Sequence, residues 1–402
     1  MTLGLYVHVP YCRRVCPYCD FFVVPIGRLG ARTSAVEAGR SLGRPEGAAS
    51  RGTATPPPGV GEFVDGLLRE IELVGDRAAT LATIHFGGGT PSTLTPGELG
   101  RIVAAIRDHF TVEPNAEITL EANPEDISAE YAEALVEVGV NRLTLGIQSL
   151  DDEALRVLGR KHRRSQALAA LDGARAGGLT NLCVDLIFGV PGQSIASWRE
   201  TVSRVLDARP EHVSAYELTI EEGTELARRR GRGQLEPLRP SALHRLFVAT
   251  DELLCAAGYE HYEVSNYARG ERFRSRHNLA YWRHRPYLGI GPAAHSFDGA
   301  TRWWNHRGLE PWLADLAARR KPIAEREVLS PVELRREEIL LGLRCADGFP
   351  REPGGRALGP PLPVQAVAEA IARKQLVIDG DRIKPTLQGM LIADELARQL
   401  CP

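Results

Sequence analysis

Short apolar runs alternate with helix-period segments along roughly the first 220 residues of the chain. Each run is rich in β-branched or apolar residues and ends at Gly, Pro or a polar turn, which predicts a strand. The predicted strands are residues 5–10, 83–86, 117–124, 142–149, 183–191 and 212–218. The predicted helices between them include residues 62–75, 96–110 and 194–207. These β–α alternations predict an α/β fold with a parallel sheet and helices outside it.

Polar and glycine-rich residues gather at the C-terminal ends of the predicted strands. Barrels and open doubly wound sheets both bind ligands at that edge. An open sheet is the simpler alternative, but the polar positions follow nearly every strand, and this distribution favours a curled sheet. We therefore predict a partial (β/α)6 barrel for residues 1–240.

One stretch inside the barrel region breaks the pattern. Residues 25–61 are dominated by Gly, Ala, Ser, Pro and Arg and have no apolar periodicity. Such a composition buries too little apolar surface to offset the entropy of ordering the chain. We predict a flexible insertion between the first strand region and the first helix, with a functional lid as the less favoured alternative.

Two further regions follow the predicted barrel. Residues 241–325 begin with an amphipathic helix and continue into a run rich in aromatic residues and histidine, which we interpret as a connecting region. In residues 326–402 a helix precedes two short strands, and Asp379-Gly380 between them is a hairpin turn signal. A final helix follows. This order predicts a C-terminal α+β extension that ends in a small winged-helix-like domain.

Composition and charge narrow the class of protein. Hydrophobic content of 43% and charged content of 25% are typical of a globular protein in solution. A formal net charge of −2 gives no bulk attraction to nucleic acid, and the winged segment has no strongly basic recognition helix. No apolar run approaches the roughly 20 residues that span a bilayer, and the N-terminus lacks the features of a secretory signal. We expect a cytoplasmic protein without a nucleic-acid partner, and leave peripheral membrane docking open.

Three of the seven cysteines, Cys12, Cys16 and Cys19, lie close together directly after the first predicted strand. A tight cluster followed by scattered single cysteines indicates metal binding in a reducing compartment. Structural zinc needs a second ligand pair, which the sequence lacks, and the nearby His8 falls in a predicted strand. Three thiolates on one loop fit a [4Fe–4S] cluster with one iron free of protein ligands. An open position of this kind suits chemistry at a metal centre.

The C-x3-C-x2-C spacing, with Tyr18 before the last cysteine, resembles the radical S-adenosylmethionine (SAM) superfamily. The resemblance implies that SAM chelates the fourth iron through its amino and carboxylate groups. It also implies an electron donor such as flavodoxin or ferredoxin, and cleavage of the sulfonium to a 5′-deoxyadenosyl radical. Strand-end carboxylates and amides suit an ammonium group and ribose hydroxyls, and an arginine suits a carboxylate. On the family's pattern, the expected cofactor-binding residues are Tyr6, Tyr18, Gly88, Gly89, Thr90, Glu121, Gln148, Arg160 and Asp185.

Further segments, among them "HFGGGTPSTL", "EANPE" and "DLIFGVPGQ", resemble the oxygen-independent coproporphyrinogen oxidase group. That group holds oxidases that decarboxylate coproporphyrinogen III and haem chaperones of the HemW class. Phe21 stands where the oxidases have a further cysteine, and only eleven residues precede Cys12, where the oxidases have a longer segment. Residues 277–282, "HNLAYW", match the chaperone signature. The resemblance implies a chaperone that binds haem and passes it to an acceptor protein, with the oxidase as the alternative.

The signature also has suitable chemistry for haem. A neutral imidazole is a good axial ligand for haem iron, which makes His277 a candidate. Tyr281 and Trp282 offer flat apolar contact for a porphyrin, and Asn278 completes the predicted haem-binding set. Arg274, Arg276, Arg283 and Arg285 surround the motif and suit propionates. A structural histidine among packing aromatics is the alternative. Whether the cluster gates haem transfer, reduces haem iron or still drives turnover stays open, and with it whether the protein is an enzyme.

Overall fold

The computed structural model describes residues 2–26, 58–353 and 362–401. The predicted insertion at 25–61 lies mainly outside these residues. Within the described chain, one large sheet has the strand order β14-β13-β12-β11-β1-β4-β5-β6-β7-β8-β10-β9. Its central strands are β1 (Thr2–Val9), β4 (Thr80–Gly88), β5 (Thr111–Ala122), β6 (Arg142–Gln148), β7 (Leu182–Phe188) and β8 (His212–Glu217). They pair in parallel and in chain order, which confirms the predicted β–α series.

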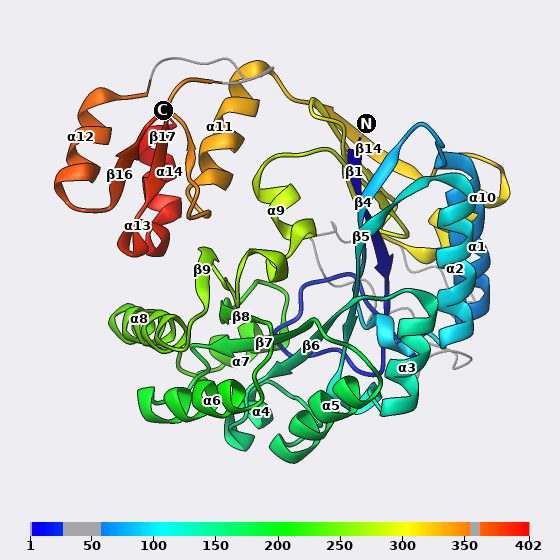
Figure 1. Cartoon of the computed structure of the whole chain (residues 1–402), viewed down its shortest axis with the longest axis horizontal. Coiled ribbons are helices and arrows are strands. Elements are labelled where there is room, and N and C mark those ends of the chain that lie inside the picture. Colours follow the sequence, from blue (N-terminus) through cyan, green and yellow to red (C-terminus); the bar gives the residue numbers. More distant parts are fainter. Residues whose placement is uncertain (1, 27–57, 354–361, 402) are drawn as a thin grey trace.

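Helices cover the convex side of the curled sheet (Figure 1). They are α1 (Val60–Val74), α2 (Pro96–His109), α3 (Ala129–Val138), α4 (Asp152–Val157), α5 (Arg164–Ala176) and α6 (Ile195–Asp207), with α7 (Glu225–Gly231) and α8 (Pro240–Ala256) following β8. Local signals set their ends: the Thr95 hydroxyl accepts from the Glu98 amide and the Glu98 carboxylate accepts from the Thr95 amide. This capping box starts α2. Among the described residues, no helix is long and apolar enough to cross a membrane.

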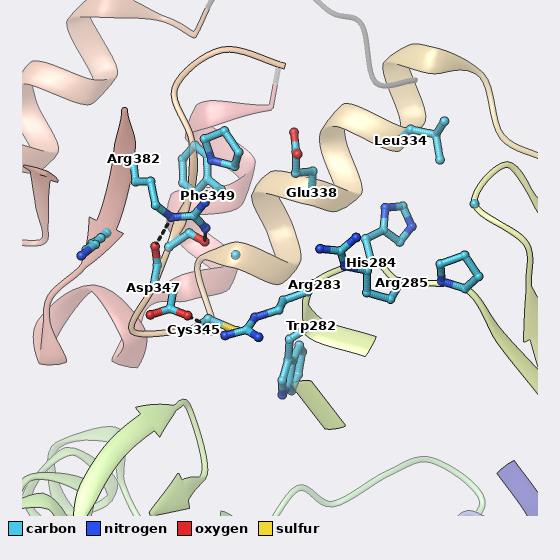
Figure 2. A pocket seen from close by; sticks show the side chains of 16 residues that line it. Trp282, Arg283, His284, Arg285, Leu334, Glu338, Cys345, Asp347, Phe349 and Arg382 are labelled. Atoms are coloured by element: carbon cyan, nitrogen blue, oxygen red, sulfur yellow. Dashed lines mark hydrogen bonds and ion pairs between the residues drawn. The ribbon is translucent and has the colours of Figure 1, made fainter. Parts of the chain in front are cut away.

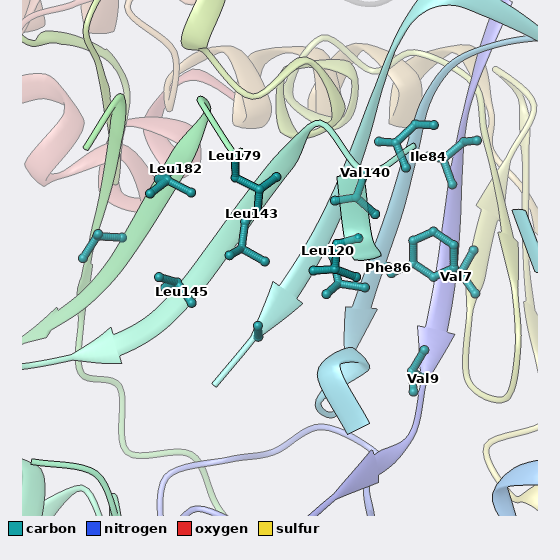
Figure 3. Close-up of a cluster of buried hydrophobic side chains, with 14 of the residues drawn as sticks. Val7, Val9, Ile84, Phe86, Leu120, Val140, Leu143, Leu145, Leu179 and Leu182 are labelled. Atoms are coloured by element: carbon teal, nitrogen blue, oxygen red, sulfur yellow. The ribbon is translucent and has the colours of Figure 1, made fainter. Parts of the chain in front are cut away.

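The outward face of the central sheet is apolar. Side chains such as Val7, Phe86, Leu120 and Leu143 are buried in one continuous core with the covering helices (Figure 3). Because side chains alternate across a strand, the residues between them point to the concave face. The side chains on the concave face are largely polar or charged. Its members include Tyr6, His8, Thr83, His85, Glu117, Thr119, Glu121, Arg142, Thr144, Cys183, Asp185, His212 and Ser214.

Residues 241–328 add strands to both ends of the sheet. At one end are β9 (Glu260–Glu263) and β10 (Asn266–Ala268); at the other are β11 (Tyr287–Ile290), β12 (His295–Phe297), β13 (Thr301–Asn305) and β14 (Ile323–Val328). Helix α9 (Arg276–Trp282) lies on the concave side between them, and α10 (Leu309–Ala317) packs against α1 (Figure 1). Because β14 and β9 remain edges, the described sheet is curled but not closed, as a partial barrel requires.

The C-terminal domain has its own hydrophobic core, formed by residues such as Leu343, Phe349 and Leu396. Its elements are α11 (Pro331–Gly342), β15 (Phe349–Pro350), α12 (Val364–Ala372), β16 (Leu376–Asp379), β17 (Arg382–Pro385), α13 (Leu387–Leu391) and α14 (Ala393–Leu400). Asp379 pairs with Arg382 across the predicted hairpin, and Gly380 takes a φ of 59° in the turn. Helices thus precede and follow the β-hairpin in the order that the sequence predicts, and the winged-helix-like assignment stays a prediction.

Candidate functional site

The three-cysteine loop begins at the C-terminal end of β1. Cys12 is buried in β2 (Tyr11–Cys12), which pairs with β3 (Val24–Pro25). Cys16 and Cys19 are half-buried, and the Cys19 amide donates to the Cys16 carbonyl over 3.1 Å, which turns the chain back on itself. All three side chains are free thiols. The loop therefore offers three thiols on one tight turn.

The environment of these thiols bears on metal binding. Burial raises the pKa of the Cys12 thiol to about 12, and it also raises the pKa of Cys19. A metal ligates the thiolate, so iron binding at these positions would release protons. No three His, Cys, Asp or Glu side chains of the described chain converge closely enough to hold a single ion. In an iron–sulfur cluster each thiolate binds a different iron atom, so its ligands need not converge on one point.

A hydrogen-bond network joins Arg160 to two cysteines of the loop, Cys16 and Cys12. The Arg160 guanidinium donates to the Cys16 sulfur at 3.5 Å and to Asn123 Oδ1 at 2.5 Å. The Asn123 amide donates to the Thr90 hydroxyl at 3.3 Å, and that hydroxyl lies 3.3 Å from the Cys12 sulfur. Sequence reasoning predicted Arg160 and Thr90 for the site but missed Asn123, whose place just after β5 was the available signal.

The glycine-rich turn after β4 packs on the chain that leads into the cysteine loop. Gly88 has a φ of 104°, and a Cβ there would come within 2.5 Å of the His8 ring. A Cβ on Gly89 would lie 2.7 Å from the Tyr11 carbonyl oxygen. These two positions therefore need glycine for close packing between strands, besides any approach to a ligand. Contact of Gly88, Gly89 and Thr90 with SAM stays a prediction.

Predicted polar residues of three strands share the concave face. His85 donates through Nε2 to Glu121 Oε1 at 2.9 Å. Burial, together with the nearby charge of Glu121, raises the pKa of Asp185 to about 7. Gln148 ends β6 with a φ of 67°, in the left-handed region, and is half-buried. Glu121 and Gln148 thus lie at the C-terminal ends of β5 and β6, and Asp185 lies in the middle of β7, while their contacts with a cofactor stay predictions.

The two predicted tyrosines lie in different surroundings. The Tyr6 ring stacks on His85 with 6.0 Å between centroids, and its hydroxyl lies 3.1 Å from His8 Nδ1. Tyr18 packs against a small buried cluster that includes Leu158 and Val190. Burial raises the pKa of both tyrosines, so both carry a hydroxyl proton at neutral pH.

His277 lies on α9, facing the concave side of the sheet, and is only 1% exposed. Its Nδ1 is 2.7 Å from the Thr83 hydroxyl and its Nε2 is 2.8 Å from the Tyr281 hydroxyl. The ring also stacks on His85 with 4.9 Å between centroids. Both ring nitrogens therefore have partners in this conformation, and an iron at Nε2 would have to displace Tyr281. Ligation by His277 stays a prediction.

The other motif residues face in different directions. The backbone N–H of Asn278 donates to the Ser275 hydroxyl at 3.2 Å, which caps α9. Trp282 lines a cavity of about 700 Å³ between α9 and α11, together with Arg283 and Cys345 (Figure 2). Tyr281 lines a different cavity, described next. The structure therefore does not bring the four predicted haem residues together around one space.

The cavity that includes Tyr281 has a volume of about 820 Å³ and lies between β1, β11–β13 and α11. We call it the aromatic cavity. Its aromatic lining consists of Phe21, Phe22, Tyr281, Tyr287, Phe297 and Trp304, besides Tyr6. Asp20 to Phe22 directly follow Cys19, so one wall of the cavity continues from the cysteine loop. Sequence reasoning singled out Tyr281 as a porphyrin contact and Phe21 as a difference from the oxidases. It missed the cavity that both residues line, because its walls come from distant parts of the chain.

Most of the arginines near the motif already have acidic partners. Arg274 pairs with Glu260. Arg276 pairs with Glu113 at 3.0 Å, and Arg283 pairs with Asp347 at 2.8 Å. Arg285 is exposed, lines the aromatic cavity, and has no side-chain partner among the described residues. Of the four, Arg285 is therefore the one best placed to meet a ligand carboxylate.

Comparisons with known proteins support the predicted family, which the fold and the cysteine loop also indicate. The radical SAM superfamily model matches residues 6–205. The heme chaperone HemW of Mycobacterium tuberculosis is 36% identical, over 99% of this chain and 94% of that protein. The heme chaperone HemW of Synechocystis is 33% identical, over 87% of this chain and 79% of that protein.

A solved structure extends the comparison to the whole fold. Coproporphyrinogen III oxidase HemN of Escherichia coli, a radical SAM enzyme, superposes with a TM-score of 0.75 over 99% of this chain and 90% of that one. The two sequences are 19% identical, so this likeness shows the shared fold alone. The family is shown by the sequence relatives that match nearly end to end. The chain belongs to the HemW family of the radical SAM superfamily.

Proposed function

We propose that this protein is a haem chaperone, which binds haem and passes it to an acceptor protein. The observation that carries the proposal is the 36% identity to the heme chaperone HemW of Mycobacterium tuberculosis over 99% of the chain. The aromatic cavity supports it, because about 820 Å³ lies within the roughly 300–1,000 Å³ of cofactor-sized sites. Its lining of aromatic rings suits the flat apolar face of a porphyrin.

The radical SAM family implies a [4Fe–4S] cluster and SAM. We propose that Cys12, Cys16 and Cys19 hold the cluster, since they are free thiols on one turn at the end of β1. When bound, the two groups supply one-electron chemistry at an iron that the protein leaves open. Arg160 would orient the SAM carboxylate, because its guanidinium already reaches the cysteine loop.

The remaining predicted residues would position SAM along the strand ends. Glu121 and Asp185 offer carboxylates on the concave face, and Gln148 offers an amide beside them. Tyr6, Tyr18, Gly88, Gly89 and Thr90 would form the remaining wall. The role of this site in haem transfer is gating, or the supply of an electron to haem iron. Both roles fit the continuity of the cysteine loop with the aromatic cavity.

The second candidate is an oxygen-independent coproporphyrinogen III oxidase. The fold that this chain shares with HemN is compatible with that function. Phe21 weighs against it, because this position on the cavity wall carries no thiol. We place the protein in the cytoplasm, with haem, an acceptor protein and an electron donor such as flavodoxin or ferredoxin as its partners.

An anaerobic assay separates the two candidates. The cluster is reconstituted, and the protein is incubated with SAM, a reductant and coproporphyrinogen III, with HemN as the positive control. The chaperone proposal predicts no protoporphyrinogen above the level of a Cys16→Ala variant. Protoporphyrinogen formed over many turnovers would instead establish the oxidase.

A further inference from the structure

His295 is an exposed imidazole on the wall of the aromatic cavity. It is the first residue of β12 and lies directly across from Trp304 of β13. The two rings stack with 5.5 Å between centroids and 25° between planes. Strand pairing and this stacking fix the position of the imidazole, while one side of the ring remains open to the cavity.

His295 differs from His8 and His284, the other histidines that line the cavity, because each of those has at least one ring nitrogen engaged. His8 lies 3.1 Å from the Tyr6 hydroxyl and 3.2 Å from the Phe22 carbonyl, and His284 lies 2.9 Å from Glu337. No hydrogen bond or ion pair to the His295 ring occurs within the described chain. An imidazole without competing partners can give a nitrogen lone pair to a metal at no cost in lost hydrogen bonds.

The protonation state of His295 also suits ligation. Partial burial, and secondarily the positive charge of Arg302, lower its pKa below the ordinary value for histidine. The ring is therefore neutral at physiological pH, and a neutral imidazole is the form that binds haem iron. His277 is also neutral, but its nitrogens are engaged by Thr83 and Tyr281.

The rest of the cavity suits two parts of a haem molecule, the apolar macrocycle and the charged propionates. Phe21, Phe22 and Tyr287 provide aromatic surface for the macrocycle. Arg285 has no side-chain partner among the described residues, and Arg307 donates only to the Asp20 carbonyl, at 3.3 Å. Both guanidiniums can therefore pair with propionates without breaking an existing ion pair.

We propose that haem is seated in the aromatic cavity with His295 as the axial ligand of its iron, and with Arg285 and Arg307 on its propionates. This assignment rests on the proposed chaperone function and adds the ligand and the seat. His277 then has a positioning role: it holds Tyr281, which forms part of the cavity wall.

Haem and metal-free protoporphyrin IX, titrated separately into the full-length protein, test the assignment. The variants are His295→Ala, His277→Gln and, as a matched control, His244→Ala, which removes an exposed histidine on α8. Absorbance reports the haem Soret band, electron paramagnetic resonance reports the ligand field of ferric haem, and porphyrin fluorescence reports metal-free binding. Circular dichroism checks that each variant is folded.

In His295→Ala we expect haem affinity to fall at least about tenfold, the lower end of the loss when even an outer partner of a metal site is removed. Its affinity for protoporphyrin IX should stay close to that of the wild type, because the iron contact alone is lost. Free imidazole should restore the wild-type Soret band. His277→Gln and His244→Ala should keep that band. The double variant Arg285→Ala/Arg307→Ala should lower the affinities for haem and for protoporphyrin IX by similar factors.

Three results would overturn the assignment, and they are distinguishable. If the wild type binds haem while His295→Ala binds it unchanged, the ligand is elsewhere and the chaperone function still stands. Loss of the Soret band in a folded His277→Gln variant alone would assign the iron to His277. If the wild type shows no saturable haem binding, the chaperone proposal itself fails.

Discussion

Arg160 Nη1 lies 3.5 Å from the Cys16 sulfur. Arg160 is 18 residues beyond the start of β6 and lies on the loop between α4 and α5. The same guanidinium donates to Asn123, whose side-chain amide donates to the Thr90 hydroxyl beside Cys12. A fixed positive charge next to the thiols offsets some of the negative charge of a thiolate-bound cluster. It is also available to a carboxylate that binds the open iron. Arg160 therefore connects the cluster site with the SAM site.

The first prediction follows from this contact. Replacing Arg160 with Met keeps most of the side-chain length and removes the charge. We expect the affinity for SAM to fall roughly 10- to 100-fold, because a hydrogen bond to a charged group contributes about 1.5–3 kcal/mol. Isothermal titration calorimetry of the cluster-loaded protein with SAM measures this affinity. The exposed neighbour Lys161→Met is the control, and unchanged SAM affinity in an Arg160 variant with full iron content would refute the assignment.

The second prediction concerns the cluster ligands. Alanine at Cys12, Cys16 or Cys19 should abolish stable cluster assembly, because each thiolate is expected to bind its own iron. Iron and sulfide analysis after anaerobic reconstitution gives the readout. Cys255→Ala, which removes an exposed thiol of α8, should assemble the wild-type amount. Full iron content in any of the three loop variants would exclude that cysteine as a ligand.

The third prediction concerns Glu70, a buried carboxylate that ties α1 to the added strands. It accepts hydrogen bonds from the Gly291 amide at 2.8 Å, the Asn305 side chain at 2.6 Å and the Trp312 indole at 2.9 Å. In Glu70→Gln an amide NH2 must face one of these donors. We expect the free energy of unfolding to fall by about 1–3 kcal/mol. Chemical denaturation measures it, with the exposed Glu72→Gln as control; equal stability of the two variants would contradict this role.

The fourth prediction is a pH dependence that originates at Glu263. This carboxyl is fully buried, and burial raises its pKa to about 8 from 4.5. Between these values the folded protein binds more protons than the unfolded chain. The contribution of Glu263 to stability is therefore present at low pH and is lost as the pH rises towards about 8, by at most roughly 1.4 kcal/mol per pH unit.

Glu263→Gln removes the titrating group and tests this directly. Denaturant titrations at about pH 5.5 and about pH 8 should show a smaller loss of unfolding free energy in the variant than in the wild type. Glu260→Gln, in the same strand but exposed, should retain the wild-type dependence. Identical pH dependence in wild type and Glu263→Gln would show that Glu263 is ionised in the folded state.

The central β–α series could be predicted because one face of each strand is apolar throughout. Val7, Phe86 and Leu143 all pack against helices, so short apolar runs mark the strands. The polar half of the pattern also carries information. Thr83 and His85 alternate with the apolar residues of β4, and this period of two indicates the polar concave face.

The candidate site was predictable where its residues follow strand ends, and not where distant segments meet. The cysteine loop has a distinctive spacing within eight residues. The aromatic cavity, in contrast, joins Phe21 to Trp304 and to Leu341 of α11, and local patterns carry no signal for such contacts. For the same reason the contact between His277 and Thr83 could not be anticipated, because the two residues lie 194 positions apart in the chain.

The most direct test of the account is a haem titration of the cluster-loaded protein, with and without SAM, followed by addition of an apo-haem protein as acceptor. The account predicts saturable, equimolar haem binding with a new Soret band, and movement of that band to the acceptor's spectrum. It also predicts that SAM changes the affinity or the transfer rate. Absence of saturable haem binding, with conversion of coproporphyrinogen III by the same preparation, would contradict the account.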